Sequence, residues 1–156
     1  MVFDDQVADI SRSRTIAAPP QAIWDVLADF GSLSSWADGV DHSCILNRGP
    51  DGVPVGTTRR VQVRRYALIE RITEFDPPAA LAYDIEGLPG RLRTVVNRWA
   101  LRPAGISTTM VTLTSRVEIG PGPVARAAEW AVCRRMARES DSMLTGLARR
   151  MENARV

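Results

Sequence analysis

The sequence contains no lysine, so all 20 of its basic residues are arginine, and its formal net charge is only +2. A balance this close to neutral argues against a nucleic-acid-binding surface, which requires clustered basic residues interleaved with aromatic ones. The chain has no such cluster. We therefore expect no nucleic-acid partner.

Cysteine and histidine are also scarce: the chain has two cysteines, Cys44 and Cys133, and one histidine, His42. A structural zinc site needs about four ligands, and these three residues are too few and too widely separated to supply them. The same scarcity excludes a disulfide framework. We expect no metal, no other cofactor and a reducing, cytoplasmic environment.

Long hydrophobic runs are absent as well. No stretch of about 18 apolar residues occurs, so no segment is expected to span a membrane. The first ten residues are acidic and lack the basic and apolar regions of a secretory signal. What is present is a chain of 156 residues, 45% of them hydrophobic. This length and composition predict a single domain over 1–156 with a substantial core, as a monomer or weak homodimer.

Hydrophobic periodicity predicts an α+β architecture. A strand over 7–16 is followed by Pro20, which suits the first turn of a helix over 21–30, and a second short helix is expected over 33–37. Six strands joined by short turns then favour an antiparallel meander. They are expected at 40–46, 56–63, 66–75, 81–86, 91–102 and 108–119. Residues 124–156 contain no proline and carry apolar residues at helical spacing, which predicts a long amphipathic helix.

Three segments of the chain carry a resemblance to a known superfamily. The segment SRTIAAPPQAIWDVLADFGSLSSW (13–36) ends a strand, opens a helix after Ala-Pro and places Trp24 and Trp36 on either side of an Asp-Phe pair. Together with VGTTRRV and LIERITEFDPPAALAYDI, it resembles the bacterial polyketide cyclase/dehydrase and lipid-transport-like branch of the START-like (SRPBCC) superfamily. The resemblance covers essentially the whole chain. It implies the helix-grip fold: a seven-stranded antiparallel curved sheet wrapped around a long C-terminal helix, with two short helices after the first strand.

The resemblance also implies an elongated, mostly apolar cavity between sheet and helix. Members of the superfamily bind lipids, sterols, polyketides, plant hormones or quinones, and a minority are cyclases, dehydratases or subunits of aromatic-ring hydroxylases. Because fold alone does not name a reaction, three hypotheses stand. The first is a carrier or sensor of a small hydrophobic ligand. The second is a cyclase or dehydratase acting by acid–base catalysis on a polyketide-like or aromatic substrate. The third is a regulatory module that binds other proteins through the basic C-terminal helix.

Strand parity predicts an ion pair between Arg59 and Glu70. Side chains alternate between the two faces of a strand, and Arg59 shares its face with Val61 while Glu70 shares its face with Leu68. A tight turn at 64–65 would place Arg59 opposite Glu70. Such a pair lies either at the cavity wall, where a buried charge needs a partner, or on the solvated face of the sheet.

Other strands also carry polar residues on the face expected to line the cavity. In the 91–102 strand, Arg93 and Asn97 share one face with apolar residues. An unpaired Arg93 would anchor an acidic ligand. Tyr83 either directs its hydroxyl into the cavity or is a core tyrosine whose hydroxyl is hydrogen-bonded within the protein. Trp36 is expected at the cavity mouth. The expected ligand-binding set is Arg59, Glu70, Tyr83, Arg93, Val95, Asn97, Trp99, Trp36, Met136 and Met143.

The candidates for acid–base catalysis are Glu70, Tyr83 and His42. His42 shares its parity with Cys44, so both are interpreted as facing inward; histidine titrates near neutral pH and could serve as a general base. The alternative is that the single histidine is structural or exposed. Arg12 and Arg14 share a face with Ile10 and Ile16 and are further candidates for inward arginines.

Overall fold

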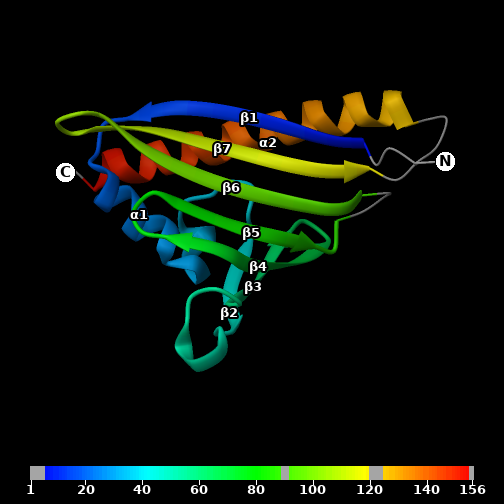
Figure 1. The fold of residues 1–156 in the computed structure, drawn as a ribbon, viewed down its shortest axis with the longest axis horizontal. Coiled ribbons are helices and arrows are strands. Elements are labelled where there is room, and N and C mark those ends of the chain that lie inside the picture. Colours follow the sequence, from blue (N-terminus) through cyan, green and yellow to red (C-terminus); the bar gives the residue numbers. More distant parts are fainter. Residues whose placement is uncertain (1–5, 89–91, 120–124, 155–156) are drawn as a thin grey trace.

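The computed structural model describes residues 6–88, 92–119 and 125–154, and the side chains of residues 6, 92–94, 119 and 125–129 lie outside that description. Seven antiparallel strands form one sheet in the order β1-β7-β6-β5-β4-β3-β2, with a long helix packed against it (Figure 1). The strands are β1 (Gln6–Ile16), β2 (His42–Asn47), β3 (Thr58–Val63), β4 (Tyr66–Asp76), β5 (Ala80–Glu86), β6 (Leu92–Gly105) and β7 (Thr108–Ile119). The helices are α1 (Pro20–Ala28), the 3₁₀ turns η1 (Phe30–Ser35) and η2 (Pro50–Gly52), and α2 (Ala125–Asn153). The predicted α+β helix-grip architecture is confirmed.

The two short helices after β1 differ from the prediction in their boundaries. Pro20 occupies the first turn of α1, as expected, and the helix buries Ile23, Trp24 and Leu27. It ends at Ala28 because Asp29 leaves the helical conformation (φ −75°, ψ 70°). The predicted helix over 33–37 is a 3₁₀ turn that begins earlier, at Phe30. Both elements lie at the end of the sheet where α2 ends (Figure 1).

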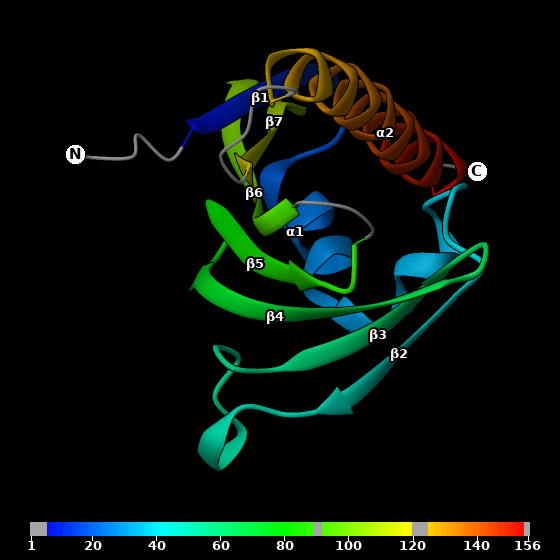
Figure 2. The same cartoon turned by 90° about the vertical axis from the view of Figure 1, so that its right-hand side faces the viewer.

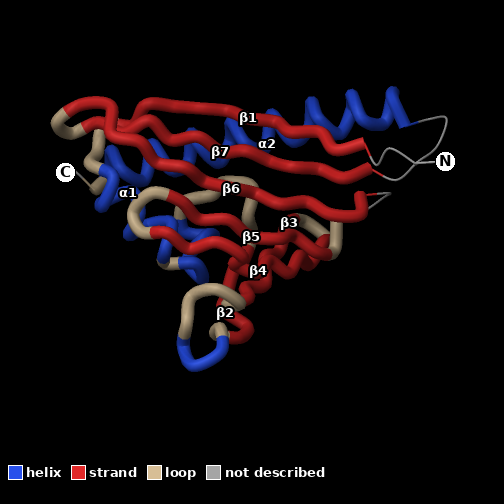
Figure 3. The backbone as a smooth tube through the Cα atoms, viewed as in Figure 1, coloured by secondary structure: helices blue, strands red, loops and turns tan. Residues whose placement is uncertain are grey.

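From β2 to β7 the strands follow one another as the predicted meander (Figure 3). The β3–β4 hairpin has the predicted register, with Arg59 opposite Glu70 and Val61 opposite Leu68. Strict alternation from Leu68 would place Phe75 on the outer face of β4. A register shift between Ile72 and Glu74 reverses the alternation, and Phe75 packs edge-on against Trp24 with ring centroids 5.0 Å apart.

Viewed at right angles, the sheet curves from β1 round to β2, and α2 lies on the β1–β7 side of the curve (Figure 2). The helix turns an apolar face inward, as predicted, with Leu147 and Met151 buried in the core. Gly146 allows α2 to approach the segment that follows η1 closely, because a Cβ atom at this position would lie 2.3 Å from the carbonyl oxygen of Trp36. A glycine therefore fixes the spacing between α2 and the segment that follows η1.

The outer face of the sheet carries exposed ion pairs, of which Arg98–Glu74 has bidentate geometry. The Nε–Oε1 distance is 2.7 Å and the Nη2–Oε2 distance is 3.2 Å. Both side chains are partly open to solvent, at 49% for Arg98 and 40% for Glu74. Water and salt therefore screen the pair, and its net contribution is small.

Replacing Glu74 by glutamine is expected to lower the free energy of unfolding by less than about 1 kcal/mol at neutral pH, because the pair is exposed. Hydrogen bonds from Arg98 lower the pKa of Glu74. The contribution of the Arg98–Glu74 pair to the free energy of unfolding is therefore fully present above the ordinary pKa of a glutamate in the unfolded chain. It disappears as the pH falls through the lowered pKa of Glu74 in the folded protein. Urea unfolding at neutral and at strongly acidic pH measures this difference. Glu152→Gln, at an exposed position on α2, is the control, and a Glu74→Gln effect that persists in acid would contradict the assignment.

Candidate functional site

A cavity of about 270 Å³ lies between the concave face of the sheet and α2. Strands β3 to β7, the segment after η1 and the helix all contribute to its wall. The apolar part of the wall is formed by Leu33, Ala37, Val40, Val61, Val63, Tyr66, Leu68, Ile85, Leu88, Val132, Met136 and Met143. The polar side chains in the wall are Glu70, Tyr83, Asn97, Ser115, Arg135, Glu139, Ser140 and Ser142. A mostly apolar wall with a few polar groups is typical of a site for a small organic molecule.

The predicted Arg59–Glu70 ion pair forms, and it is buried. Arg59 Nε lies 2.8 Å and Nη2 lies 2.7 Å from the same oxygen, Oε1 of Glu70. The side chains are 4% and 6% exposed, so the solvated alternative is excluded. Glu70 reaches the cavity wall, whereas Arg59 lies behind it and is not part of the wall.

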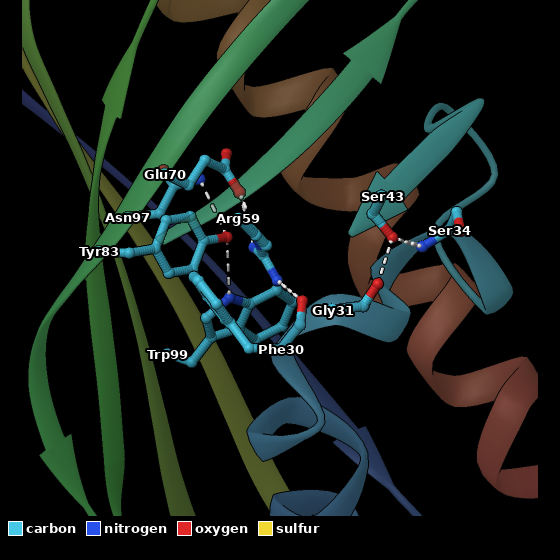
Figure 4. A network of polar contacts seen from close by, with 9 residues as sticks. All are labelled: Phe30, Gly31, Ser34, Ser43, Arg59, Glu70, Tyr83, Asn97 and Trp99. Atoms are coloured by element: carbon cyan, nitrogen blue, oxygen red, sulfur yellow. Dashed lines mark hydrogen bonds and ion pairs between the residues drawn. The ribbon is translucent and has the colours of Figure 1, made fainter. Parts of the chain in front are cut away.

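The guanidinium of Arg59 is enclosed on several sides. Its Nη1 donates a hydrogen bond to the carbonyl oxygen of Phe30 over 2.9 Å. Its central carbon lies 3.7 Å from the ring centroid of Phe30 and 4.7 Å from that of Tyr83. Such cation–π contacts favour a desolvated guanidinium. The single 3₁₀ turn of η1 thus supplies both a ring and a carbonyl to the buried charge (Figure 4).

A second polar group, centred on Tyr83, lies next to the ion pair (Figure 4). The Tyr83 hydroxyl oxygen accepts hydrogen bonds from Trp99 Nε1 at 3.3 Å and Asn97 Nδ2 at 3.5 Å. Ser115 donates in turn to Asn97 Oδ1 at 2.6 Å. Burial, reinforced by the charge of Glu70, raises the pKa of Tyr83. The phenol therefore keeps its proton at neutral pH and can act as a hydrogen-bond donor.

Five of the predicted ligand-binding residues lie in the cavity wall: Glu70, Tyr83, Asn97, Met136 and Met143. Val95 and Trp99 are buried on the predicted face, but they pack into the core outside this wall. Trp36 lies in the core rather than at the cavity mouth, with its ring 5.9 Å from that of Trp99. Arg93 lies in β6, but its side chain is outside the described residues, so its role as an anchor stays a prediction.

Two inward assignments made from parity were wrong. His42 and Cys44 are exposed, and the other face of β2, with Ser43 and Ile45, is the half-buried one. Arg12 and Arg14 do point toward α2, but they are exposed at its side and bind Asp141 and Thr145 there. A strand of six residues carries too little alternation to fix its face from the sequence alone.

Five polar residues of the wall were not predicted from spacing. Arg135, Glu139 and Ser142 are at exposed positions of α2, whereas the other two, Ser115 and Ser140, lie inside the protein. Both are almost completely buried, with 1% and 2% of their surfaces exposed. A signal was present for each. Ser115 alternates with Leu113 and Val117 on the buried face of β7, and Ser140 lies one helical turn after Met136. Small polar residues on an otherwise apolar face indicate positions that can line a cavity.

Within the part of the chain that the structure describes, no group of three or more His, Cys, Asp or Glu side chains could hold a metal ion. In the same residues, no helix is both long enough and apolar enough to cross a membrane.

The curved sheet, the long helix packed against it and the cavity between them define a helix-grip fold. The chain belongs to the family described as polyketide cyclase / dehydrase and lipid transport, whose sequence model matches residues 7–152. A comparison with curated proteins gave no match.

Solved structures share the fold at low sequence identity. The Zhui aromatase/cyclase from Streptomyces sp. R1128 superimposes with a TM-score of 0.78 at 18% identity, over 94% of each chain. A protein of Thermus thermophilus gives 0.76 at 20% identity, over 94% of this chain and 99% of the other. A START superfamily protein from Mycobacterium smegmatis gives 0.61 at 20% identity, over 88% of this chain and 98% of the other. These similarities establish the fold; ligand and reaction have to be argued from the cavity.

Proposed function

We propose that this protein binds a small hydrophobic ligand in the cavity, as a carrier or sensor acting in the cytoplasm. The observation that carries the proposal is the cavity of about 270 Å³ with its mostly apolar wall. An unfilled apolar space of this size costs stability, because the side chains around it lose packing contacts. A ligand that fills the space restores those contacts. Membership of a family described by lipid transport as well as cyclisation supports the same proposal.

The identity of the ligand can be read directly from purified protein. Native mass spectrometry, followed by extraction into organic solvent, is expected to yield a co-purifying lipid or aromatic compound. Protein refolded without this compound should bind it again and unfold at a higher temperature in its presence, since a ligand that binds only the folded state stabilises it.

A cavity-filling substitution tests whether this space is the binding site. Met143 lies on α2, is half-buried and forms part of the wall. Met143→Trp is expected to weaken ligand binding at least about tenfold, because the indole occupies volume that the ligand needs. Arg138→Trp, at an exposed position on the same helix outside the wall, should leave affinity unchanged. Calorimetric titration measures both, and equal affinities for the two variants would place the ligand elsewhere.

A second candidate function, a cyclase or dehydratase, is favoured by one feature of the cavity. Glu70 and Tyr83 meet at the same end of it, and a carboxylate beside a protonated phenol provides a base and an acid. His42, the third sequence-based candidate, is exposed and drops out of this scheme. The extracted ligand should then be converted by the purified protein, and Glu70→Gln should stop conversion while binding persists. A ligand that binds and is never converted argues for the carrier.

A further inference from the structure

Glu70 forms part of the cavity wall, and its second carboxylate oxygen, Oε2, has no hydrogen-bond donor among the described residues. Both nitrogens of Arg59 that contact Glu70 bind its Oε1. Among the described residues, nothing donates a hydrogen bond to Oε2, which carries no dashed line in Figure 4. Glu70 is only 5% exposed, yet it forms part of the cavity wall. Oε2 is not fully buried, so it remains accessible and can accept a hydrogen bond from a donor on a ligand.

The charge that compensates Glu70 cannot reach a ligand. Arg59 is 3% exposed, lies outside the wall and is occupied by Glu70, the Phe30 carbonyl and two aromatic rings. At this end of the cavity, a ligand meets the negative partner of the ion pair and not the positive one. An anionic group placed there would approach a carboxylate at low dielectric, which is unfavourable. The acidic ligand that inward arginines suggested therefore does not fit at Arg59.

The Tyr83 hydroxyl provides the opposite hydrogen-bonding group. Trp99 and Asn97 both donate to its oxygen, and indole nitrogen can only donate. The hydroxyl hydrogen finds no acceptor among the residues that the structure describes. Tyr83 is also part of the cavity wall. One end of the mostly apolar cavity thus presents an acceptor that is available to a ligand donor and a donor that is available to a ligand acceptor.

We infer that the ligand presents an uncharged hydroxyl group, as in a phenol or an enol, at this end of the cavity, where the hydroxyl donates to Glu70 Oε2 while a ligand oxygen accepts from Tyr83. A single hydroxyl can do both, since it carries one hydrogen and two lone pairs. This inference rests on the proposed function, because it specifies the chemistry of the molecule that the cavity binds.

Four naphthalene probes separate the two hydrogen bonds on the unchanged protein. Naphthalene offers neither group, 2-methoxynaphthalene only accepts, 2-naphthol donates and accepts, and 2-naphthoate is anionic. By calorimetric titration, we expect 2-naphthol to bind about 10- to 100-fold more tightly than 2-methoxynaphthalene, the range for a hydrogen bond to a charged group. We expect 2-methoxynaphthalene to bind about 2- to 10-fold more tightly than naphthalene. 2-Naphthoate should bind more weakly than 2-naphthol.

Two variants assign each ratio to its residue. Glu70→Gln should reduce the advantage of 2-naphthol over 2-methoxynaphthalene, and Tyr83→Phe should remove that of 2-methoxynaphthalene over naphthalene. Glu152→Gln, at an exposed position on α2 outside the wall, should leave both ratios unchanged. If Glu70→Gln does not fold, the affinity ratios among the four probes on the unchanged protein still test the inference.

The outcomes separate the inference from the proposed function. Equal binding of 2-naphthol and 2-methoxynaphthalene, or binding of 2-naphthoate as tight as that of 2-naphthol, would overturn the inference and leave ligand binding standing. Failure of all four probes to bind would overturn both.

Discussion

Replacing Arg59 by methionine is expected to lower the free energy of unfolding by about 3–5 kcal/mol, the cost of leaving a buried charge without its partner. Glu70 would lose the hydrogen bond from Arg59 Nε and the ion-pair contact with Nη2, at a position where only 6% of its side chain is exposed. The carbonyl of Phe30 would lose its donor as well. Urea unfolding at neutral pH, with the slope compared between variants, measures the change.

The double variant Arg59→Met/Glu70→Met separates the cost of the lone charge from the value of the pair. Because both charges are removed together, we expect it to recover most of the loss and to approach the stability of the unchanged protein. The exposed pair Arg98–Glu74 is the matched comparison, since it also joins strands of this sheet. If Arg59→Met costs no more than Glu74→Gln, the Arg59–Glu70 pair is solvated in solution.

The second large effect is expected at Gly146. Its Cβ position lies 2.3 Å from the carbonyl oxygen of Trp36 and 3.6 Å from the Cα of Ala37, so an alanine would force α2 away from this segment. Overpacking of this kind costs about 1–3 kcal/mol. The better helix propensity of alanine returns up to about 1 kcal/mol, so the net effect is a destabilisation.

The control for Gly146→Ala is Gly39→Ala, at a glycine whose Cβ would meet no atom within 4 Å. This substitution is expected to leave stability unchanged or to raise it slightly, because it restricts the unfolded chain. Thermal unfolding of the two variants side by side measures the difference. A stable Gly146→Ala variant would mean that α2 can move outward at little cost.

The sequence was sufficient to predict the strands and their pairing, because alternation and tight turns depend on residues that are close together in the chain. Alternation along β3 and β4, together with one tight turn, fixes the register that pairs Arg59 with Glu70. Family resemblance then supplied the position of the C-terminal helix. Alternation fails where a strand is short, as at His42 in β2, or where a bulge reverses it, as at Phe75.

The cavity was harder to predict because the core and the cavity wall are lined by the same kinds of residue. Asn97 and Trp99 lie on the same face of β6, yet only Asn97 reaches the cavity. The difference depends on how far α2 stands from each strand, which is set by packing between distant parts of the chain. Parity reports which way a side chain points. It carries no information about whether another side chain or empty space lies opposite.

Among the residues that the structure describes, the sheet is open, and β1 and β2 each have one side without a strand neighbour. Unpaired backbone groups at such an edge can template pairing with another chain. The β1 edge carries charged side chains, Asp9, Arg12 and Arg14, and α2 packs beside it. The β2 edge is six residues long and irregular between Ile45 and Asn47. Both edges oppose extension of the sheet by a second molecule, so copies of this protein that meet would have to associate through another surface.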